Sequence, residues 1–111
     1  MLLSIVVPVY NEEENIANFY KAVTDVMSGL TYDYELIFVD DGSSDSSAMI
    51  LREIAFNDKH VKVLLLARNF GHQTVLTCGL DYAYGDVVIT MDDDIQHPPE
   101  MTPELDRKSV Q

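Results

Sequence analysis

Short apolar runs alternate with amphipathic segments along the chain, and this alternation limits the possible folds more than any other feature. The apolar runs lie at residues 3–9, 34–39, 61–66 and 86–91. Runs of this length, rich in β-branched residues, predict strands that are buried on both faces. Helical segments fill the intervals, so the order is β-α-β-α-β-α-β. This order predicts the α/β class, with a mostly parallel sheet and helices on both faces.

The segments between the predicted strands have helical periodicity. In residues 11–27, apolar side chains recur at three- and four-residue spacing, which predicts an amphipathic helix. Asn11 is its expected N-cap, and Glu14, three residues later, would nearly complete a capping box. Two further helices are expected over residues 45–57 and 74–84.

Composition indicates the class of protein and disfavours direct recognition of several kinds of binding partner. At 111 residues the chain is at most one domain, and its net charge of −12 disfavours direct binding to nucleic acid or anionic membranes. The apolar N-terminus lacks a basic region and a cleavage site and is too short to span a bilayer, so we expect a cytoplasmic protein without a transmembrane segment. The single cysteine, Cys78, forms no internal disulfide and is expected to be a small core residue on a helix.

Acidic side chains follow three of the predicted strands. Glu12 comes after the first strand, Asp40 and Asp41 after the second, and residues 92–94 after the fourth. The carboxyl ends of parallel strands meet at one edge of a sheet, where ligands bind in open α/β folds. If the first and fourth strands are neighbours, as in a 3-2-1-4 order, the binding crevice is expected between their ends.

The Asp-Asp-Asp run favours a hard divalent cation. In an extended segment, the side chains of Asp92 and Asp94 point the same way and can converge on one ion, while Asp93 points elsewhere or reaches a second group. Gln96 continues this alternation and would add an amide oxygen. Mg²⁺ or Mn²⁺ is usually held by one or two carboxylates together with substrate phosphates. The alternative is a solvated acidic loop without a ligand.

Other signals are informative by their absence or are weaker. The chain has neither a G-x-G-x-x-G segment nor a P-loop, so its acidic edge is expected to bind phosphates only through a metal, as in a nucleoside diphosphate bridged by Mg²⁺ or Mn²⁺. Arg68 is the only cation in the loop after the third strand and is expected to pair with an acid or a phosphate. For His60 in a surface turn, His72 at a helix start and His97 beside the acids, a structural role is the expectation.

Four segments, in this order, resemble a known family. They are "SIVVPVYNEEENI", "ELIFVDDGSSD", "ARNFGHQ" and "GDVVITMDDDIQHPPE". They resemble the inverting family 2 glycosyltransferases of the GT-A fold, and most of all the polyprenyl-phosphate group of dolichol-phosphate mannose synthase and bactoprenol glucosyltransferase. The likeness covers residues 3 to about 105 and implies a Rossmann-like GT-A nucleotide-binding half. Residues 1–111 would be the nucleotide-sugar-binding part, without the acceptor half. Full-length relatives often lie at the cytoplasmic face of a membrane.

The resemblance also implies roles for individual residues. A carboxylate at Asp41 would accept the ring N–H of uracil or guanine. Catalytic roles are implied for Asp92 and Asp94, which with Gln96 match the D-x-D region that carries the metal and the diphosphate. The residues expected at the nucleotide are Pro8, Tyr10, Glu12, Val39, Asp41 and Asp93.

The reaction implied by the resemblance moves a sugar from a UDP- or GDP-sugar donor to an acceptor, with inversion at the anomeric carbon. The acceptor would be a polyprenyl phosphate or another nucleophile, and no general base is assigned. Two alternatives stay open: a nucleotide-sugar-binding module without turnover, and a metal-dependent phosphohydrolase on the same kind of sheet. An exposed sheet flank in a half-domain would favour a homo-oligomer.

Overall fold

The structure is a computed structural model that describes residues 1–91, and predictions for residues 92–111 lie outside it. Its strands form one sheet in the order β3-β2-β1-β4, and all neighbouring strands are parallel. This confirms the predicted α/β class, and it places the first and fourth strands side by side. The strands are β1 (Leu2–Val9), β2 (Asp33–Asp40), β3 (Val61–Leu65) and β4 (Val87–Thr90).

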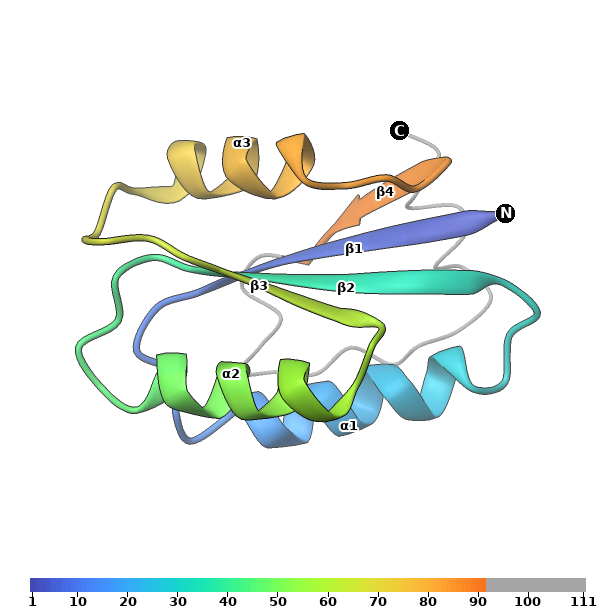
Figure 1. The fold of residues 1–111 in the computed structure, drawn as a ribbon, viewed down its shortest axis with the longest axis horizontal. Helices are drawn as coiled ribbons and strands as arrows, with labels where there is room; N and C mark the ends of the chain where they lie inside the picture. The colour runs from blue at the N-terminus through green and yellow to red at the C-terminus, as the bar shows by residue number, and fades with distance from the viewer. Residues whose placement is uncertain (92–111) are drawn as a thin grey trace.

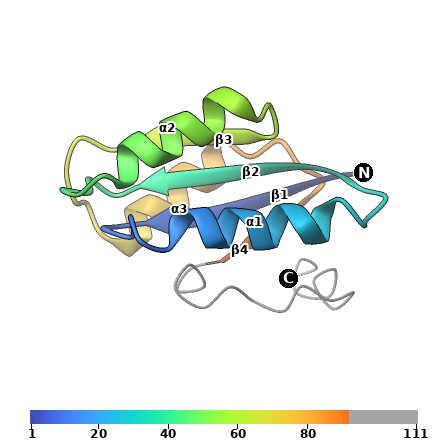
Figure 2. The same cartoon turned by 90° about the horizontal axis from the view of Figure 1, so that it is seen from below.

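Three helices cover the two faces of the sheet. They are α1 (Ile16–Met27), α2 (Ser47–Asn57) and α3 (His72–Asp81). Figure 1 shows α1 and α2 on one face and α3 on the other, and Figure 2 shows α1 and α2 side by side. Helices therefore lie on both faces, as the order of elements predicted. No helix within residues 1–91 is long and apolar enough to cross a membrane.

Alternate residues of the central strands pack into two separate apolar clusters. The larger cluster lies under α1 and α2, where the rings of Phe19 and Phe38 meet edge to face with centroids 6.3 Å apart. The smaller cluster lies under α3 and contains Val6, Val39 and Val75. Both faces of β1 and β2 are thus buried, which explains why their sequences are continuous apolar runs instead of alternating ones.

The predicted cap of the first helix is wrong. Helix α1 begins at Ile16, its N-cap is Asn15, and no side chain caps it. Asn11 instead adopts a left-handed conformation with φ 51°, and its side-chain oxygen accepts the backbone N–H of Ser44 at 2.8 Å. Asn side chains form such local turns readily, so a tertiary contact replaced the cap. Helix α3 also differs from its predicted range, because it begins at His72 and ends at Asp81.

A buried polar network joins the strands on the α3 side, toward their amino ends. The carboxylate of Glu35 accepts hydrogen bonds from the Ser4 hydroxyl at 2.5 Å and the Tyr84 backbone N–H at 2.6 Å. It also pairs with the ammonium of Lys62 at 2.6 Å, and that ammonium lies 4.4 Å from the centre of the Tyr84 ring. Burial alone would raise the pKa of Glu35, but these hydrogen bonds and the Lys62 charge outweigh it and lower the pKa.

A second polar cluster joins α1 to the turn after α2. The Tyr20 hydroxyl donates to Asp58 at 2.5 Å, and Nδ1 of His60 lies 3.1 Å from the other Asp58 oxygen. The His60 ring stacks on Tyr34 with centroids 4.5 Å apart. Burial, the hydrogen bond to Asp58 and its negative charge raise the pKa of Tyr20 to about 12. The role predicted for His60 in a turn is confirmed, although its ring is only partly exposed.

Candidate functional site

The loops at the carboxyl ends of β1, β2 and β3 lie together at one end of the sheet, at the left of Figure 1. They comprise residues 10–15, 41–46 and 66–71. Glu12 and Asp41 lie in the first two loops, and Asp40 is the last residue of β2. The predicted meeting of these acids at one edge is therefore confirmed for the described residues.

The first loop is bonded to the second by Asn11 and Glu12. The backbone N–H of Asn11 donates to the Ser43 hydroxyl at 2.8 Å, while its side-chain oxygen accepts the N–H of Ser44. The backbone N–H of Glu12 donates to the Ser47 hydroxyl at 2.9 Å. Two of these contacts use hydroxyls of the "DGSSDSS" segment as acceptors for backbone donors of the first loop, and the third uses the Asn11 side chain as the acceptor for a backbone donor of that segment. The two loops therefore form one structural unit.

Asp40 and Asp41 accept hydrogen bonds from different loops. Asp40 is buried and accepts the backbone N–H of Ser43 at 3.1 Å. Asp41 accepts the backbone N–H of Phe70 at 2.7 Å and that of Gly71 at 3.2 Å, one with each carboxylate oxygen. Asp41 thus joins the second loop to the third. Within residues 1–91, neither carboxylate has a Lys, Arg or His partner at ion-pair distance.

The residues predicted to contact a nucleotide differ in accessibility. Pro8 and Val39 are partners on adjacent strands, on the face that α3 covers. The Val39 side chain is 0% exposed and packs under α3, so its side chain is closed to a ligand in this structure. Tyr10 is 48% exposed at the end of β1. Their roles in nucleotide binding, and that of Asp41, stay predictions.

A polar hollow of about 360 Å³ lies beside the first loop. Its walls are Asn11, Glu12, Glu13, Glu14, Asn15 and Asp45. Within residues 1–91, no group of three or more His, Cys, Asp or Glu side chains is arranged to hold a metal ion. The predicted metal ligands Asp92, Asp94 and Gln96, together with Asp93 and His97, lie outside the described residues.

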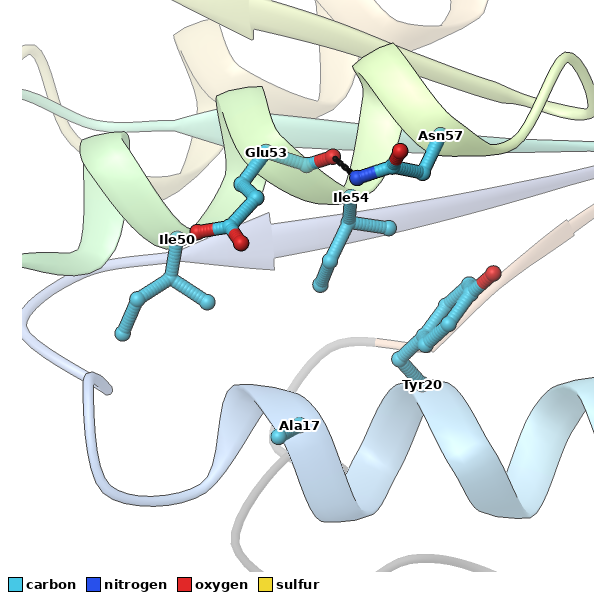
Figure 3. Close-up of a pocket in the computed structure, with 6 residues that line it drawn as sticks. All are labelled: Ala17, Tyr20, Ile50, Glu53, Ile54 and Asn57. Atoms are coloured by element: carbon cyan, nitrogen blue, oxygen red, sulfur yellow. Dashed lines mark hydrogen bonds between the residues drawn. The ribbon is translucent and has the colours of Figure 1, made fainter.

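A more apolar pocket of about 260 Å³ lies between α1 and α2. Figure 3 shows its lining, with Ala17 and Tyr20 on α1 facing the side chains of α2. The Asn57 side chain donates to the backbone oxygen of Glu53 at 2.9 Å, so this polar group is already satisfied. The pocket does not gather several polar groups that converge on its centre, which ligand sites usually have. The edge formed by the three loops is therefore the candidate site.

Two features of this edge were not predicted from the sequence. One is the use of Asn11 as a bridge between loops, and the other is the requirement for glycine at position 42. Gly42 has φ 72°, and a Cβ atom there would lie 2.3 Å from the backbone carbonyl carbon of Arg68. A glycine directly after two acids at a strand end was a visible signal for a positive-φ turn. Nothing in the local sequence indicated which loop it would touch.

Comparisons with known proteins agree on the kind of protein. The chain is 49% identical to an uncharacterised glycosyltransferase, YkcC, of Bacillus subtilis (strain 168), covering 95% of this chain and 32% of that protein. It is 46% identical to the undecaprenyl-phosphate 4-deoxy-4-formamido-L-arabinose transferase of Proteus mirabilis (strain HI4320), covering 93% and 32%. It is 44% identical to the bactoprenol glucosyl transferase of Shigella phage SfV, covering 97% and 35%. The chain thus spans about a third of the length of these relatives.

Solved glycosyltransferases share the fold. The mannosyltransferase PcManGT from Pyrobaculum calidifontis, in complex with GDP-Man and Mn²⁺, aligns with a TM-score of 0.75 at 21% identity, covering 97% of this chain and 31% of that one. Glucosyl-3-phosphoglycerate synthase from Mycobacterium tuberculosis, in complex with Mn²⁺, UDP and phosphoglyceric acid, aligns with a TM-score of 0.63 at 28% identity, covering 82% and 32%. The parallel sheet is therefore that of the GT-A glycosyltransferases.

The family model for glycosyl transferase family 2 matches residues 4–108, which is nearly the whole chain. The match includes most of β1, all of β2, β3 and β4, and the three loops at the candidate site. The relatives with named activities are sugar transferases, and the fold is that of solved glycosyltransferases. The chain belongs to glycosyl transferase family 2.

Proposed function

We propose that this chain is the nucleotide-sugar-binding part of an inverting, metal-dependent glycosyltransferase that transfers a sugar from a UDP- or GDP-sugar to a polyprenyl phosphate. The observation that carries the proposal is the identity of 46% to an undecaprenyl-phosphate sugar transferase over 93% of the chain. The solved relatives with GDP-Man and Mn²⁺ or with UDP and Mn²⁺ support the donor class and the cation.

The proposed donor site is the edge formed by the three loops. Pro8, Tyr10, Glu12 and Asp41 would lie around the base and ribose together with the backbone of Val39, and Asp93 would lie nearby. Asp92, Asp94 and Gln96 would hold Mg²⁺ or Mn²⁺, because two carboxylates and an amide oxygen are the oxygen ligands that these ions prefer. The bound cation would neutralise charge that develops on the leaving diphosphate.

The proposed chemistry needs no strong base from this chain. An oxygen of the lipid phosphate forms a bond to the anomeric carbon while the bond from that carbon to the diphosphate breaks. The nucleoside diphosphate leaves with the bonding electron pair. A phosphate monoester is already largely ionised near neutral pH, so its oxygen is nucleophilic without deprotonation. The acidic loops would keep the negative donor in place only with the cation bound.

Calorimetric titration tests the donor site. We expect the chain to bind either UDP or GDP, with binding that depends on Mn²⁺ or Mg²⁺. The Asp92→Asn and Asp94→Asn variants should lose the metal-dependent part of the affinity, about tenfold or more, because each removes a charged ligand. Asp81→Asn, which changes an exposed acid at the end of α3, is the matched control. Nucleotide affinity that ignores the cation in all variants would contradict the proposal.

A transfer assay separates turnover from binding alone. The chain spans only 32% of the arabinose transferase, so a nucleotide-sugar-binding module without turnover is the second candidate. Radiolabelled UDP- or GDP-sugar and undecaprenyl phosphate in detergent micelles would be incubated with the chain and Mn²⁺. Labelled lipid would support the transferase, whereas metal-dependent binding without labelled lipid would support the module. Release of phosphate from simple phosphate esters would instead support a phosphohydrolase.

A further inference from the structure

Helix α2 carries a stripe of exposed side chains on the side that faces away from the sheet. Leu51 is 0% exposed in the larger apolar cluster, whereas Phe56, about 140° further round the helix, is 90% exposed. Met49 is 64% exposed, and the exposed residues Arg52 and Glu53 lie between it and Phe56. Their three- and four-residue spacing puts all four on one helix face. We call Met49, Arg52, Glu53 and Phe56 the α2 stripe.

The charged side chains of the α2 stripe have no ion-pair partners in the part of the chain that the structure describes. Neither Arg52 nor Glu53 lies at ion-pair distance from an opposite charge within residues 1–91. The pocket of about 260 Å³ between α1 and α2 adjoins the stripe, with Ile50 and Ile54 in its lining (Figure 3). Single exposed apolar side chains are common, but two on one helix face beside such a pocket suit a protein partner.

The order of side chains along the α2 stripe is complementary to itself when the helix direction is reversed. From its start the stripe is apolar, positive, negative and apolar. Suppose that a second copy of α2 lies antiparallel across it, with Arg52 of each copy facing Glu53 of the other. Met49 of each copy then faces Phe56 of the other. A twofold contact requires this property, because one patch must be complementary to an identical patch.

We propose that two copies of this chain form a twofold symmetric dimer in which their α2 stripes pack antiparallel. Each Phe56 ring contacts Met49 of the second copy and the pocket wall at Ile50. This surface differs from the sheet flank that the sequence suggested for an oligomer, and the inference does not depend on the proposed function. Because α2 has 11 residues, about three turns, the contact buries less than the roughly 1,200 Å² of stable complexes. The dimer is therefore weak, with a dissociation constant on the order of 100 µM.

Sedimentation equilibrium of the 111-residue chain, from about 5 µM to about 1 mM, measures the dimer. Phe56→Ser should weaken dimerisation about tenfold or more, because the dimer contains two of these contacts. Since Phe56 is 90% exposed, the same change should leave the free energy of unfolding of the dilute monomer unchanged. Tyr82→Ser is the matched control, because Tyr82 is exposed at the end of α3, on the other face of the sheet (Figure 1).

Charge reversal tests which residues face each other. Arg52→Glu puts two pairs of acids into the contact, and Glu53→Arg puts two pairs of bases there, so each should weaken the dimer about tenfold or more. An equimolar mixture of the two variants should regain wild-type affinity within about threefold, because every pair is then of opposite charge. The double variant Arg52→Glu/Glu53→Arg should regain it alone. Asp81→Arg has the same charge change as Glu53→Arg but lies on α3, and mixing it with Arg52→Glu should restore nothing.

Each remaining outcome would overturn the proposal. One is a wild-type chain that stays monomeric up to about 1 mM. Another is a dimer that Phe56→Ser and Arg52→Glu leave unchanged, which would place the contact on a different surface, such as a sheet edge. If both charge variants weaken the dimer and their mixture does not restore it, Arg52 and Glu53 do not face each other. A loss of monomer stability in Phe56→Ser would mean that another part of the same chain covers the ring.

Discussion

Buried and partly buried carboxylates at the two ends of the sheet have different partners. Toward the amino ends of the strands, Glu35 is paired with Lys62 at 2.6 Å, and Asp58 lies between Tyr20 and His60. At the carboxyl ends, Asp40 and Asp41 accept only N–H and hydroxyl donors from the neighbouring loops. Within residues 1–91, Glu35 in the first region is balanced internally by Lys62, whereas Asp40 and Asp41 in the second region have no Lys, Arg or His at ion-pair distance.

This difference indicates that acidic residues contribute to stability at the amino ends of the strands and are available for ligand binding at the carboxyl ends. A buried charge that has a cation and several hydrogen bonds contributes to a closed structure that needs no ligand. Carboxylates bonded only to uncharged N–H and hydroxyl donors hold the loops in position but leave their own negative charge unbalanced. An edge of this kind favours a ligand that arrives with its own cation, which agrees with a metal–nucleotide complex.

The largest expected effect comes from opening the internally balanced region. Glu35→Ala removes the acceptor for the Ser4 hydroxyl, the Tyr84 N–H and the Lys62 ammonium at once. We expect the free energy of unfolding to fall by about 3 kcal/mol, because buried donors lose their partner. Urea denaturation followed by circular dichroism measures it, with Asp81→Asn as control. A loss below about 1 kcal/mol would mean that the two regions do not differ as described.

A smaller effect is expected at the bridge between the first two loops. Asn11→Ala removes the acceptor for the Ser44 N–H and places alanine at φ 51°, so we expect a loss of about 2 kcal/mol. Asn11→Gly tolerates the positive φ and should lose only about 1 kcal/mol. The two variants, compared by urea denaturation, separate backbone strain from the lost hydrogen bond. Equal losses would mean that strain at this residue is negligible.

The Tyr20–Asp58 contact should contribute less. Tyr20→Phe is expected to cost about 1 kcal/mol, the net value of one hydrogen bond to a partly exposed partner. The wild-type protein has a raised pKa of about 12 at Tyr20, above the ordinary value of 10.0. Stability from this contact is therefore complete below pH 10.0 and lost as the pH rises toward about 12. Titration of tyrosinate absorbance measures the pKa. The step near pH 12 should be missing in Tyr20→Phe, which would assign it to Tyr20.

Acid should produce the smallest change in stability, and it should act through Glu35 and Asp58, the carboxylates near the amino ends of the strands. The pKa of Glu35 and that of Asp58 are lowered, because hydrogen bonds from their partners outweigh the effect of burial. Their stabilising contribution is present above the ordinary values of 4.5 and 3.8 and is lost as the pH falls through the lower folded values. Thermal melts below pH 5 should show less pH dependence in Glu35→Gln than in the wild type. An unchanged profile would contradict this assignment.

The regular part of the fold was predictable because hydrophobic periodicity determines it. Apolar runs with helices between them lead to a parallel sheet, and the right-handed crossover rule leaves few arrangements of four strands. The limits of the helices were less predictable. Asn11 has the sequence context of a helix cap, but its side chain bonds to Ser44, 33 residues away in sequence. Local helix propensity contains no information about a hydrogen-bond partner in another loop that competes with the capping position.

The candidate site shows the same division. The acids of the first two loops could be placed at one edge, since parallel strands end on the same side. The partners of Asp41 could not be predicted, because they are backbone groups of Phe70 and Gly71, which every residue except proline offers. The networks of Glu35 and Tyr20 were missed for a related reason: their members lie on different strands and helices, without a local pattern.

The order of the strands has a consequence for synthesis on the ribosome. β1 is made first but lies inside the sheet, and its second neighbour is β4, where Leu3 pairs with Val87. At typical elongation rates, roughly ten seconds pass between the synthesis of β1 and that of β4. Until then β1 has no partner on its β4 side. During this interval one edge of an apolar strand has open hydrogen-bonding groups that another chain can pair with. Expression yield should therefore depend more strongly on translation rate and on chaperones than the small size of the chain suggests.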